Sequence, residues 1–262
     1  MAQPTALPLD VRLMAAVANV LFGVLALLLV GGAGWWVVRH PAWALGGITV
    51  VGDVQHQNAV TVRAHLASRL QGSFLTLDLK EVKRLLEGVP WVRQAVVQRD
   101  FPNRLKVTLQ EHQAVAWWGE SGGGRLVNAQ GEVFEANPDD PAADQWVELL
   151  GPQGQSAQVY ALFQALQPAF ARMGQDIARL ELDGRGSWKV RLDGGARIEL
   201  GRGEPQELLQ RIQAFVASIT TVSQRYGGRD IESADLRYPN GYALRLRGVS
   251  TLEAPAGTPK KP

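Results

Sequence analysis

The longest uncharged stretch of the chain, residues 13–38, lies close to its N-terminus. It contains no Asp, Glu, Lys or Arg, and an α-helix needs about 20 apolar residues to cross a hydrocarbon core about 30 Å thick. Trp35, Trp36 and Trp43 lie at or just after its end, where amphipathic rings favour the level of the lipid headgroups. The pattern predicts one transmembrane helix, residues 13–38, after a short cytoplasmic arm, residues 1–12.

A cleaved secretory signal is the alternative interpretation of this stretch. Such a signal has an apolar core of about 7 to 15 residues before small residues, and the small residues 31–34 resemble a cleavage site. The run is too long for a signal, so an uncleaved anchor is favoured. Arg12 and Arg39 balance each other as topology signals. The orientation is therefore predicted from the large segment after the span. We expect a cytoplasmic N-terminus and a periplasmic C-terminus.

The segment 46–115 begins with the pattern of a small mixed domain. A β-branched run closed by glycine at 47–52 predicts a strand. An apolar stripe at i, i+4 spacing follows the possible N-cap Asn58 and predicts a helix. A second helix is expected to begin at the N-cap Asp78 and to end at Gly88.

Strand character returns at residues 91–99 and 104–111. In the second of these runs apolar and polar residues alternate, as a half-buried antiparallel strand requires. The resulting order of strand, helix, helix, strand and strand, directly after a membrane anchor, resembles a POTRA domain, a module that docks polypeptides.

The segment 116–249 is predicted to be a mostly antiparallel β domain with two packed helices. One helix has Ser156 as its N-cap and Pro168 as the point where it kinks or ends, and the more amphipathic one covers 204–226. The tail, 250–262, is predicted to be disordered. Three pairs of runs predict hairpins: 126–128 with 132–134, 187–192 with 196–200, and 231–238 with 242–249.

Composition removes several classes of chemistry. The chain has no cysteine, a net charge of +2 and a pI of about 9.0, without a basic block that would mark a nucleic-acid groove. Its four histidines show no metal-ligand spacing, and neither a phosphate-binding loop nor a nucleophile elbow is present. We therefore predict no catalytic, metal or cofactor site, no nucleic-acid partner and no small-molecule substrate.

Three segments together resemble the FtsQ/DivIB family of cell-division proteins. The resemblance runs from the membrane span to Arg247, and a turn at residues 151–154 adds to it. The segments are Pro90-Trp91-Val92 with residues 99–105, residues 185–188 with 198–202, and residues 235–241.

The resemblance implies a bitopic inner-membrane protein that links early and late septal components at the division site without catalysis. Its β domain is expected to bind the small coiled-coil division proteins FtsB and FtsL, and other divisome components are expected as further partners. Leu246 stands where some members carry tryptophan, so its contact with the partner is expected to be weaker or different. The cytoplasmic arm is shorter than in many relatives, which argues against a cytoplasmic contact. The partner-binding positions that the resemblance implies are Arg185, Trp188, Tyr238, Asn240, Gly241, Tyr242, Leu244, Leu246 and Arg247.

Two other functions compete with the division scaffold. A POTRA-bearing envelope translocation or outer-membrane assembly factor would lead into a series of lipid-facing strands, and the sequence shows no such series. An enzyme is motivated only by a cleft between two domains. Arg237, Arg245 and Arg247 alternate with apolar residues, so they predict either an ordinary solvent face or an anion site.

Two positions carry sharper expectations. The final strand, 242–249, is expected to be an edge to which a partner strand can add, with Arg185 pairing to an acidic residue of that partner and Tyr238 packing beneath it. Trp91 either packs in the first domain or contacts a partner, and packing is favoured because a large aromatic after proline often anchors a turn.

Overall fold

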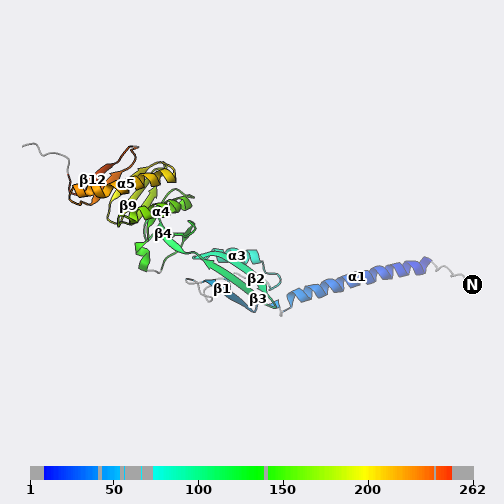
Figure 1. Cartoon of the computed structure of the whole chain (residues 1–262). Helices are drawn as coiled ribbons and strands as arrows, with labels where there is room; N and C mark the ends of the chain where they lie inside the picture. Colours follow the sequence, from blue (N-terminus) through cyan, green and yellow to red (C-terminus); the bar gives the residue numbers. More distant parts are fainter. Residues whose placement is uncertain are drawn as a thin grey trace, which may run out of the picture. The chain divides into compact units, whose positions relative to one another are not determined.

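The structure is a computed structural model, and it forms two compact units, Met1–Glu111 and His112–Pro262 (Figure 1). It describes residues 9–40, 43–53, 56, 66, 73–138, 141–238 and 240–249, so the tail predicted at 250–262 lies outside the described residues. The predicted domain boundary, between residues 115 and 116, falls within the first strand of the second unit.

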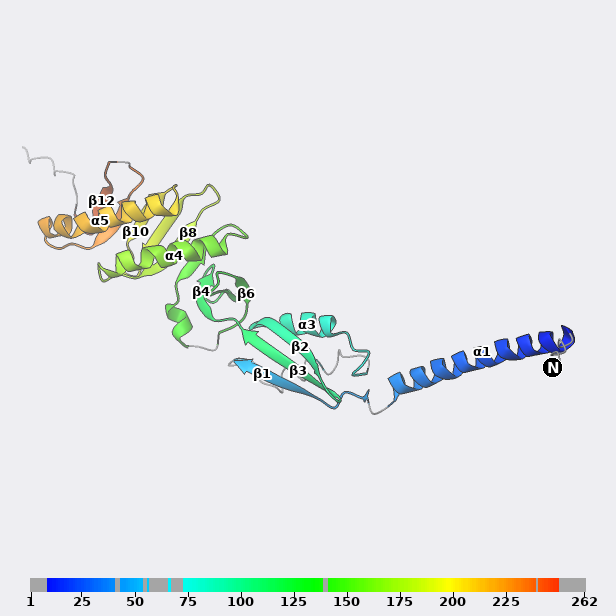
Figure 2. The ribbon, with the colours of Figure 1, turned by 45° about the vertical axis from the view of Figure 1, so that its right-hand side comes forward.

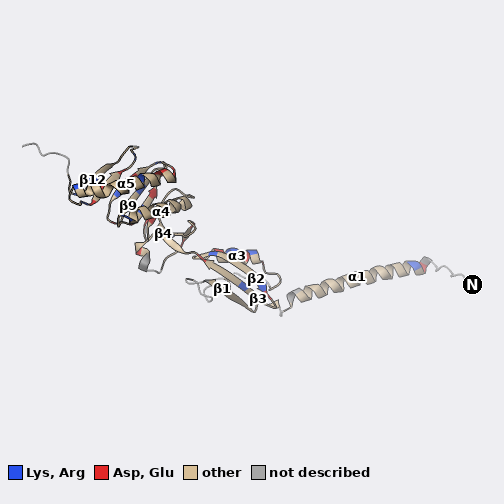
Figure 3. Ribbon diagram, viewed as in Figure 1, with Lys and Arg blue, Asp and Glu red and all other residues tan. Residues whose placement is uncertain are grey.

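The apolar stretch near the N-terminus forms one long helix, α1 (Leu9–Arg39). The part from Asp10 to Val37 is long and apolar enough to cross a membrane, and the rest of the described chain contains no second helix of that kind. No charged residue interrupts the body of the helix (Figure 3). Its large side chains, including Trp35 and Trp36, are exposed, as expected of a helix whose solvent is lipid.

The rest of the first unit contains a three-stranded sheet and a helix. The sheet order is β1-β3-β2, with β1 parallel and β2 antiparallel to the central β3, and α3 lies against β2 (Figure 2). The helix predicted after Asn58 lies outside the described residues apart from Leu66, which is fully buried. The elements are β1 (Gly47–Asp53), α3 (Leu79–Glu87), β2 (Val92–Asp100) and β3 (Arg104–Glu111).

The alternation predicted for residues 104–111 is confirmed in β3. Leu105, Val107 and Leu109 are buried, and the residues between them are exposed. They pack with Val82 and Leu86 of α3 in one apolar cluster. The sequence period of two thus sets which face of this sheet receives the helix.

The N-cap predicted at Asp78 is also confirmed. Its Oδ1 accepts hydrogen bonds from the amides of Lys80 at 2.8 Å and Glu81 at 3.4 Å. These amides lie in the first turn of α3 and have no carbonyl partner within the helix.

Asp78→Ala is expected to lower the free energy of unfolding by about 1 kcal/mol, because these two amides lose their acceptor. Asp78→Asn retains a side-chain oxygen and serves as the control. Denaturant unfolding of both variants measures the difference. Equal stability of the alanine variant and the wild type would contradict the capping role.

The second unit is built on one nine-stranded mixed sheet. The strand order is β12-β11-β10-β9-β8-β7-β4-β5-β6, and α4 and α5 lie side by side on one of its faces (Figure 2). The elements are β4 (Ala114–Trp118), β5 (Arg125–Asn128), β6 (Val133–Glu135), η2 (Pro141–Gln145), β7 (Glu148–Leu150), α4 (Ser156–Ala171), β8 (Ile177–Leu182), β9 (Trp188–Leu192), β10 (Arg197–Gly201), α5 (Pro205–Arg225), β11 (Ile231–Asp235) and β12 (Ala243–Leu246).

The core of the second unit lies between the two helices and the sheet. The apolar stripe predicted for α5 is buried at Leu208, Ile212, Phe215 and Ile219. The same cluster contains Trp188 of β9. The amphipathic pattern of α5 is therefore satisfied by the sheet, as predicted.

One prediction about α4 is wrong, and one of the two alternatives predicted for Pro168 is excluded. Gln155, rather than Ser156, occupies the N-cap, and its side chain makes no capping hydrogen bond. Pro168 does not end the helix, which continues to Ala171. Burial of Leu166 and Phe170 on the sheet side provides tertiary packing that outweighs the one backbone hydrogen bond that proline removes.

The last predicted hairpin is also corrected. Its strands are shorter than predicted, because β11 ends at Asp235 and β12 begins at Ala243. The chain leaves the β11–β12 ladder after Asp235 because the Leu236 amide donates to the Glu199 carbonyl of β10 at 2.8 Å, and its side chain is buried.

Candidate protein-binding site

The strand β12 forms one end of the nine-stranded sheet. Among the described strands it pairs only with β11. The Arg247 amide donates to the Asp230 carbonyl at 2.9 Å, on the β11 side. Backbone groups of successive strand residues point to opposite edges, so the Arg245 amide also faces β11. The amide and carbonyl of Leu244 and the amide of Leu246 consequently face the open side, where no described strand pairs with them, whereas the Leu246 carbonyl accepts a hydrogen bond from the Val249 amide at 3.2 Å.

The apolar side chains of this edge point into the protein. Leu246 is buried, Leu244 packs against the core, and the Tyr242 ring meets Phe215 edge-on at 5.0 Å. The Tyr242 hydroxyl lies 2.9 Å from that of Ser218. A partner at this edge would therefore contact the backbone of these residues, and not their side chains as predicted.

The predicted contact of Trp188 with a partner also disagrees with its burial. Trp188 exposes 3% of its surface and belongs to the core under the helices. A partner cannot reach it in this structure. Its role is to hold the start of β9, which directly follows the turn that carries Arg185.

The turn before β9 holds Arg185 at the surface. The carboxylate of Asp183 accepts hydrogen bonds from the amides of Ser187 and Arg185, both at 2.9 Å. These two hydrogen bonds hold the pKa of the Asp183 carboxyl below its usual value. Arg185 is exposed, and its backbone is fixed by a carboxylate that remains charged.

The segment after β11 carries a second arginine to the same end of the sheet. The Arg237 guanidinium donates to the Asp235 carboxylate at 2.8 and 2.6 Å, which lowers the pKa of Asp235 and raises that of Arg237. Gly201 permits this position, because a Cβ there would lie 2.7 Å from the Arg237 Cγ. Tyr238 follows and is 57% exposed, and Asn240 and Gly241 are exposed as well.

Four arginines line one cavity of about 390 Å³ at this end, which we call the arginine pocket. Arg185 and Arg237 are joined by Arg202 and Arg211, whose roles the sequence did not indicate. The Arg211 guanidinium is held by the carbonyls of Leu200 and Arg202 at 3.0 and 2.8 Å. Arg185 and Arg202 form no ion pair with any described residue, so both are available to an anion.

Arg245 of β12 and Arg247, the residue directly after β12, are partly neutralised. Arg245 pairs with Glu232 at 3.2 Å, and Arg247 pairs with Asp230 at 3.9 Å. All four side chains are largely exposed, and such pairs contribute little to stability. They form the polar outer face of the β11–β12 pair, which favours the solvent-face interpretation of Arg245 and Arg247.

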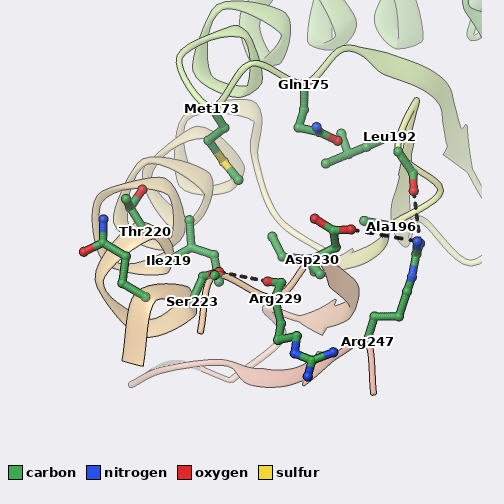
Figure 4. A pocket seen from close by; sticks show the side chains of 14 residues that line it. Met173, Gln175, Leu192, Ala196, Ile219, Thr220, Ser223, Arg229, Asp230 and Arg247 are labelled. Atoms are coloured by element: carbon green, nitrogen blue, oxygen red, sulfur yellow. Dashed lines mark hydrogen bonds and ion pairs between the residues drawn. The ribbon is translucent and has the colours of Figure 1, made fainter. Parts of the chain in front are cut away.

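A second pocket, of about 490 Å³, lies near the other end of β12 (Figure 4). Its lining includes the apolar side chains of Leu192, Ala196 and Ile219, and Arg247 bridges its rim by donating to the Gly194 carbonyl at 3.4 Å. The described residues bring together no group of three or more His, Asp or Glu side chains that could hold a metal ion.

The predicted POTRA motif lies between α3 and β2. Pro90 is exposed, and Trp91 and Val92 are buried. Trp91 adopts a left-handed backbone conformation with φ of 73°, and its ring stacks on that of His56 with centroids 3.7 Å apart. This burial supports packing as the role of Trp91.

Known families match both parts of the chain. The model "POTRA domain, FtsQ-type" matches residues 44–112, and the model "Cell division protein FtsQ/DivIB, C-terminal" matches residues 116–237. A cell division protein FtsQ from Thiomonas arsenitoxydans is 41% identical over 94% of this chain and 91% of its own length. The chain belongs to the FtsQ family of cell division proteins.

Other FtsQ proteins show how far the family similarity extends. The FtsQ of Burkholderia pseudomallei is 40% identical over 93% of this chain, and that of Vibrio cholerae is 30% identical over 85%. The POTRA domain predicted from the sequence is confirmed as FtsQ-type. The matched C-terminal region ends at Arg237, so the arginine pocket lies within it and the β12 edge lies beyond it.

Proposed function

We propose that this FtsQ-family chain is a non-enzymatic scaffold of the divisome, anchored by α1 in the inner membrane with its POTRA and β domains in the periplasm. We propose that it binds FtsB and FtsL and thereby links early and late septal components at the division site. The observation that carries this proposal is the open edge of β12, which begins beside the arginine pocket.

The binding mode follows from the chemistry of the edge. A partner strand that adds to β12 would pair with the outward amide and carbonyl of Leu244 and with the outward amide of Leu246, which gives affinity without requiring their side chains. An acidic side chain of the same partner would enter the arginine pocket and meet Arg185 and Arg202. Tyr238, exposed between the two features, would pack beneath the partner.

Leu244→Pro is expected to weaken binding of an FtsB fragment at least about tenfold, because proline removes the outward amide and fills the space of the added strand. Proline is tolerated where the amide of an edge strand faces solvent. Leu244→Ala is the matched control, since it loses the same side chain but retains the amide. Equal affinity of the two variants, measured by calorimetric titration, would rule out strand addition at β12.

Orientation and location are tested together. A fluorescent protein that matures only in the cytoplasm is expected to be dark when fused after Pro262, because the large segment after α1 lies in the periplasm. Fused before Met1, the same protein is expected to mark the division site in growing cells. Bright C-terminal fusions would reverse the topology, and uniform envelope labelling by the N-terminal fusion would contradict the divisome role.

A further inference from the structure

Phe101 is the most exposed large apolar side chain of the described residues outside α1, with 70% of its surface accessible. It occupies the three-residue connection between β2 and β3, at one end of the POTRA sheet. A single exposed apolar side chain is common on protein surfaces, and it indicates a contact only together with its surroundings. The surroundings of this ring therefore indicate what it contacts.

A line of aromatic rings connects Phe101 to the start of the POTRA domain. The Phe101 ring meets the buried Phe74 ring edge-on at 5.2 Å, and Phe74 stacks on Trp43 at 6.5 Å with an interplanar angle of 11°. The Phe74 amide donates to the Trp43 carbonyl at 2.8 Å. Packing against Phe74, which itself stacks on Trp43, thus holds the Phe101 ring in place.

Arg99 makes this end of the domain rigid. Its guanidinium donates to the carbonyls of Phe74 at 2.9 Å, Leu75 at 3.2 Å and Leu77 at 2.8 Å. On the other side, the Gly46 amide donates to the Asn103 carbonyl at 2.8 Å. The connection that carries the exposed Phe101 ring is therefore held by hydrogen bonds on both sides.

The same ring line begins at the end of α1. The Trp43 amide donates to the carbonyl of His40, the residue after α1, at 3.0 Å, and a hydrogen bond of this span keeps the two Cα atoms within about 7 Å. The His40 ring meets Trp36 edge-on at 4.7 Å. Trp36 lies three residues, about 4.5 Å along the helix axis, before Arg39, the last residue of α1. Exposed tryptophans at a helix end mark the headgroup level of a bilayer.

We propose that Phe101, with Trp43, docks this end of the POTRA domain on the phospholipid surface that α1 crosses. The inference rests on the proposed membrane anchor. Lipid is the expected contact because the hydrogen bond from Trp43 to His40 and the ring contact of His40 with Trp36 tie the ring line to the end of α1, where aromatic side chains favour the headgroup layer. The contact holds this end of the POTRA domain at the headgroup level of the membrane.

Photo-crosslinking of the full chain tests the proposal. The analogue p-benzoylphenylalanine replaces Phe101, which preserves an aromatic side chain, in nanodiscs of phosphatidylethanolamine and phosphatidylglycerol. The matched control carries the analogue in place of Tyr226, which is 52% exposed in the second unit. Mass spectrometry of the irradiated protein is expected to find lipid adducts at position 101 at least about tenfold more often than at position 226.

Two results would overturn the proposal. Equal lipid labelling at the two positions, or adducts of position 101 with a second copy of the chain, would show that Phe101 does not face lipid. Unequal melting of the two labelled chains would show that the analogue had disturbed the loop, and Trp43 would then carry the analogue with the same expectation. Release of the wild-type chain from membranes by alkaline carbonate would instead contradict the proposed membrane anchor. Failure of the anchor and failure of the Phe101 contact are therefore distinguishable.

Discussion

Arg185→Glu is expected to abolish measurable binding of an FtsB fragment while leaving the melting temperature nearly unchanged. Truncation or reversal of one side of a partly desolvated charge pair costs about 2 to 5 kcal/mol, a loss of about 30-fold to several thousandfold in affinity. Arg185 is suited to such a pair because the Asp183 turn fixes its backbone. Its guanidinium forms no ion pair with a described residue that the partner would have to break.

Matched variants separate this charge contact from general electrostatics. Arg125→Glu makes the same charge change on β5, near the opposite end of the sheet, and is expected to bind normally. Arg202→Glu tests the second available arginine of the pocket and is expected to weaken binding in the same direction. Tyr238→Ala is expected to abolish binding as well. Wild-type affinity of both Arg185→Glu and Tyr238→Ala would refute the proposed site.

Trp91→Ala is expected to lower the free energy of unfolding of the POTRA domain by about 3 to 5 kcal/mol, the usual cost of truncating a large buried aromatic. Trp91 exposes 7% of its surface and stacks on His56 at 3.7 Å. Scanning calorimetry of the full chain measures the loss, with Trp91→Phe as the control that retains a ring. An unchanged melting profile combined with lost partner binding would assign Trp91 to a contact instead.

A glycine variant of Trp91, compared with the alanine variant, tests the strain in the backbone at this position. The Trp91 φ of 73° lies in the left-handed region, which costs a non-glycine residue roughly 1 to 2 kcal/mol. Glycine escapes that cost, so Trp91→Gly is expected to be no less stable than Trp91→Ala, although glycine is the more flexible residue when unfolded. A glycine variant clearly less stable than the alanine variant would show that the strain is small.

Local patterns were sufficient for much of the fold. The uncharged run predicted α1, the cap at Asp78 predicted the start of α3, and the period of two in residues 104–111 predicted β3 and its buried face. Each of these features is encoded within a few neighbouring residues. Intrinsic signals of this kind are strong because the membrane, the helix terminus and the half-buried sheet each impose one simple requirement.

Other elements have no comparable signal. Three strands at the centre of the large sheet, β4, β7 and β8, were not predicted, and β7 contains only three residues. It pairs in parallel with both β4 and β8, which are distant in the chain. A strand this short shows no periodicity, so its conformation is decided by the neighbours that supply its hydrogen bonds.

The sequence by itself determined that the chain carries one long apolar helix, a POTRA domain and a β domain of the FtsQ family, and it indicated Arg185 and the final strand as candidates. Only the tertiary structure decided what those candidates present. It turned Trp188, Tyr242 and Leu246 inward, left the backbone of β12 open, and joined Arg185 to Arg202 and Arg211. The physical reason is that the strand order places the β8–β9 turn next to the C-terminal ends of β10 and β11. Pairing between strands that are distant in the chain cannot be predicted from any local sequence pattern.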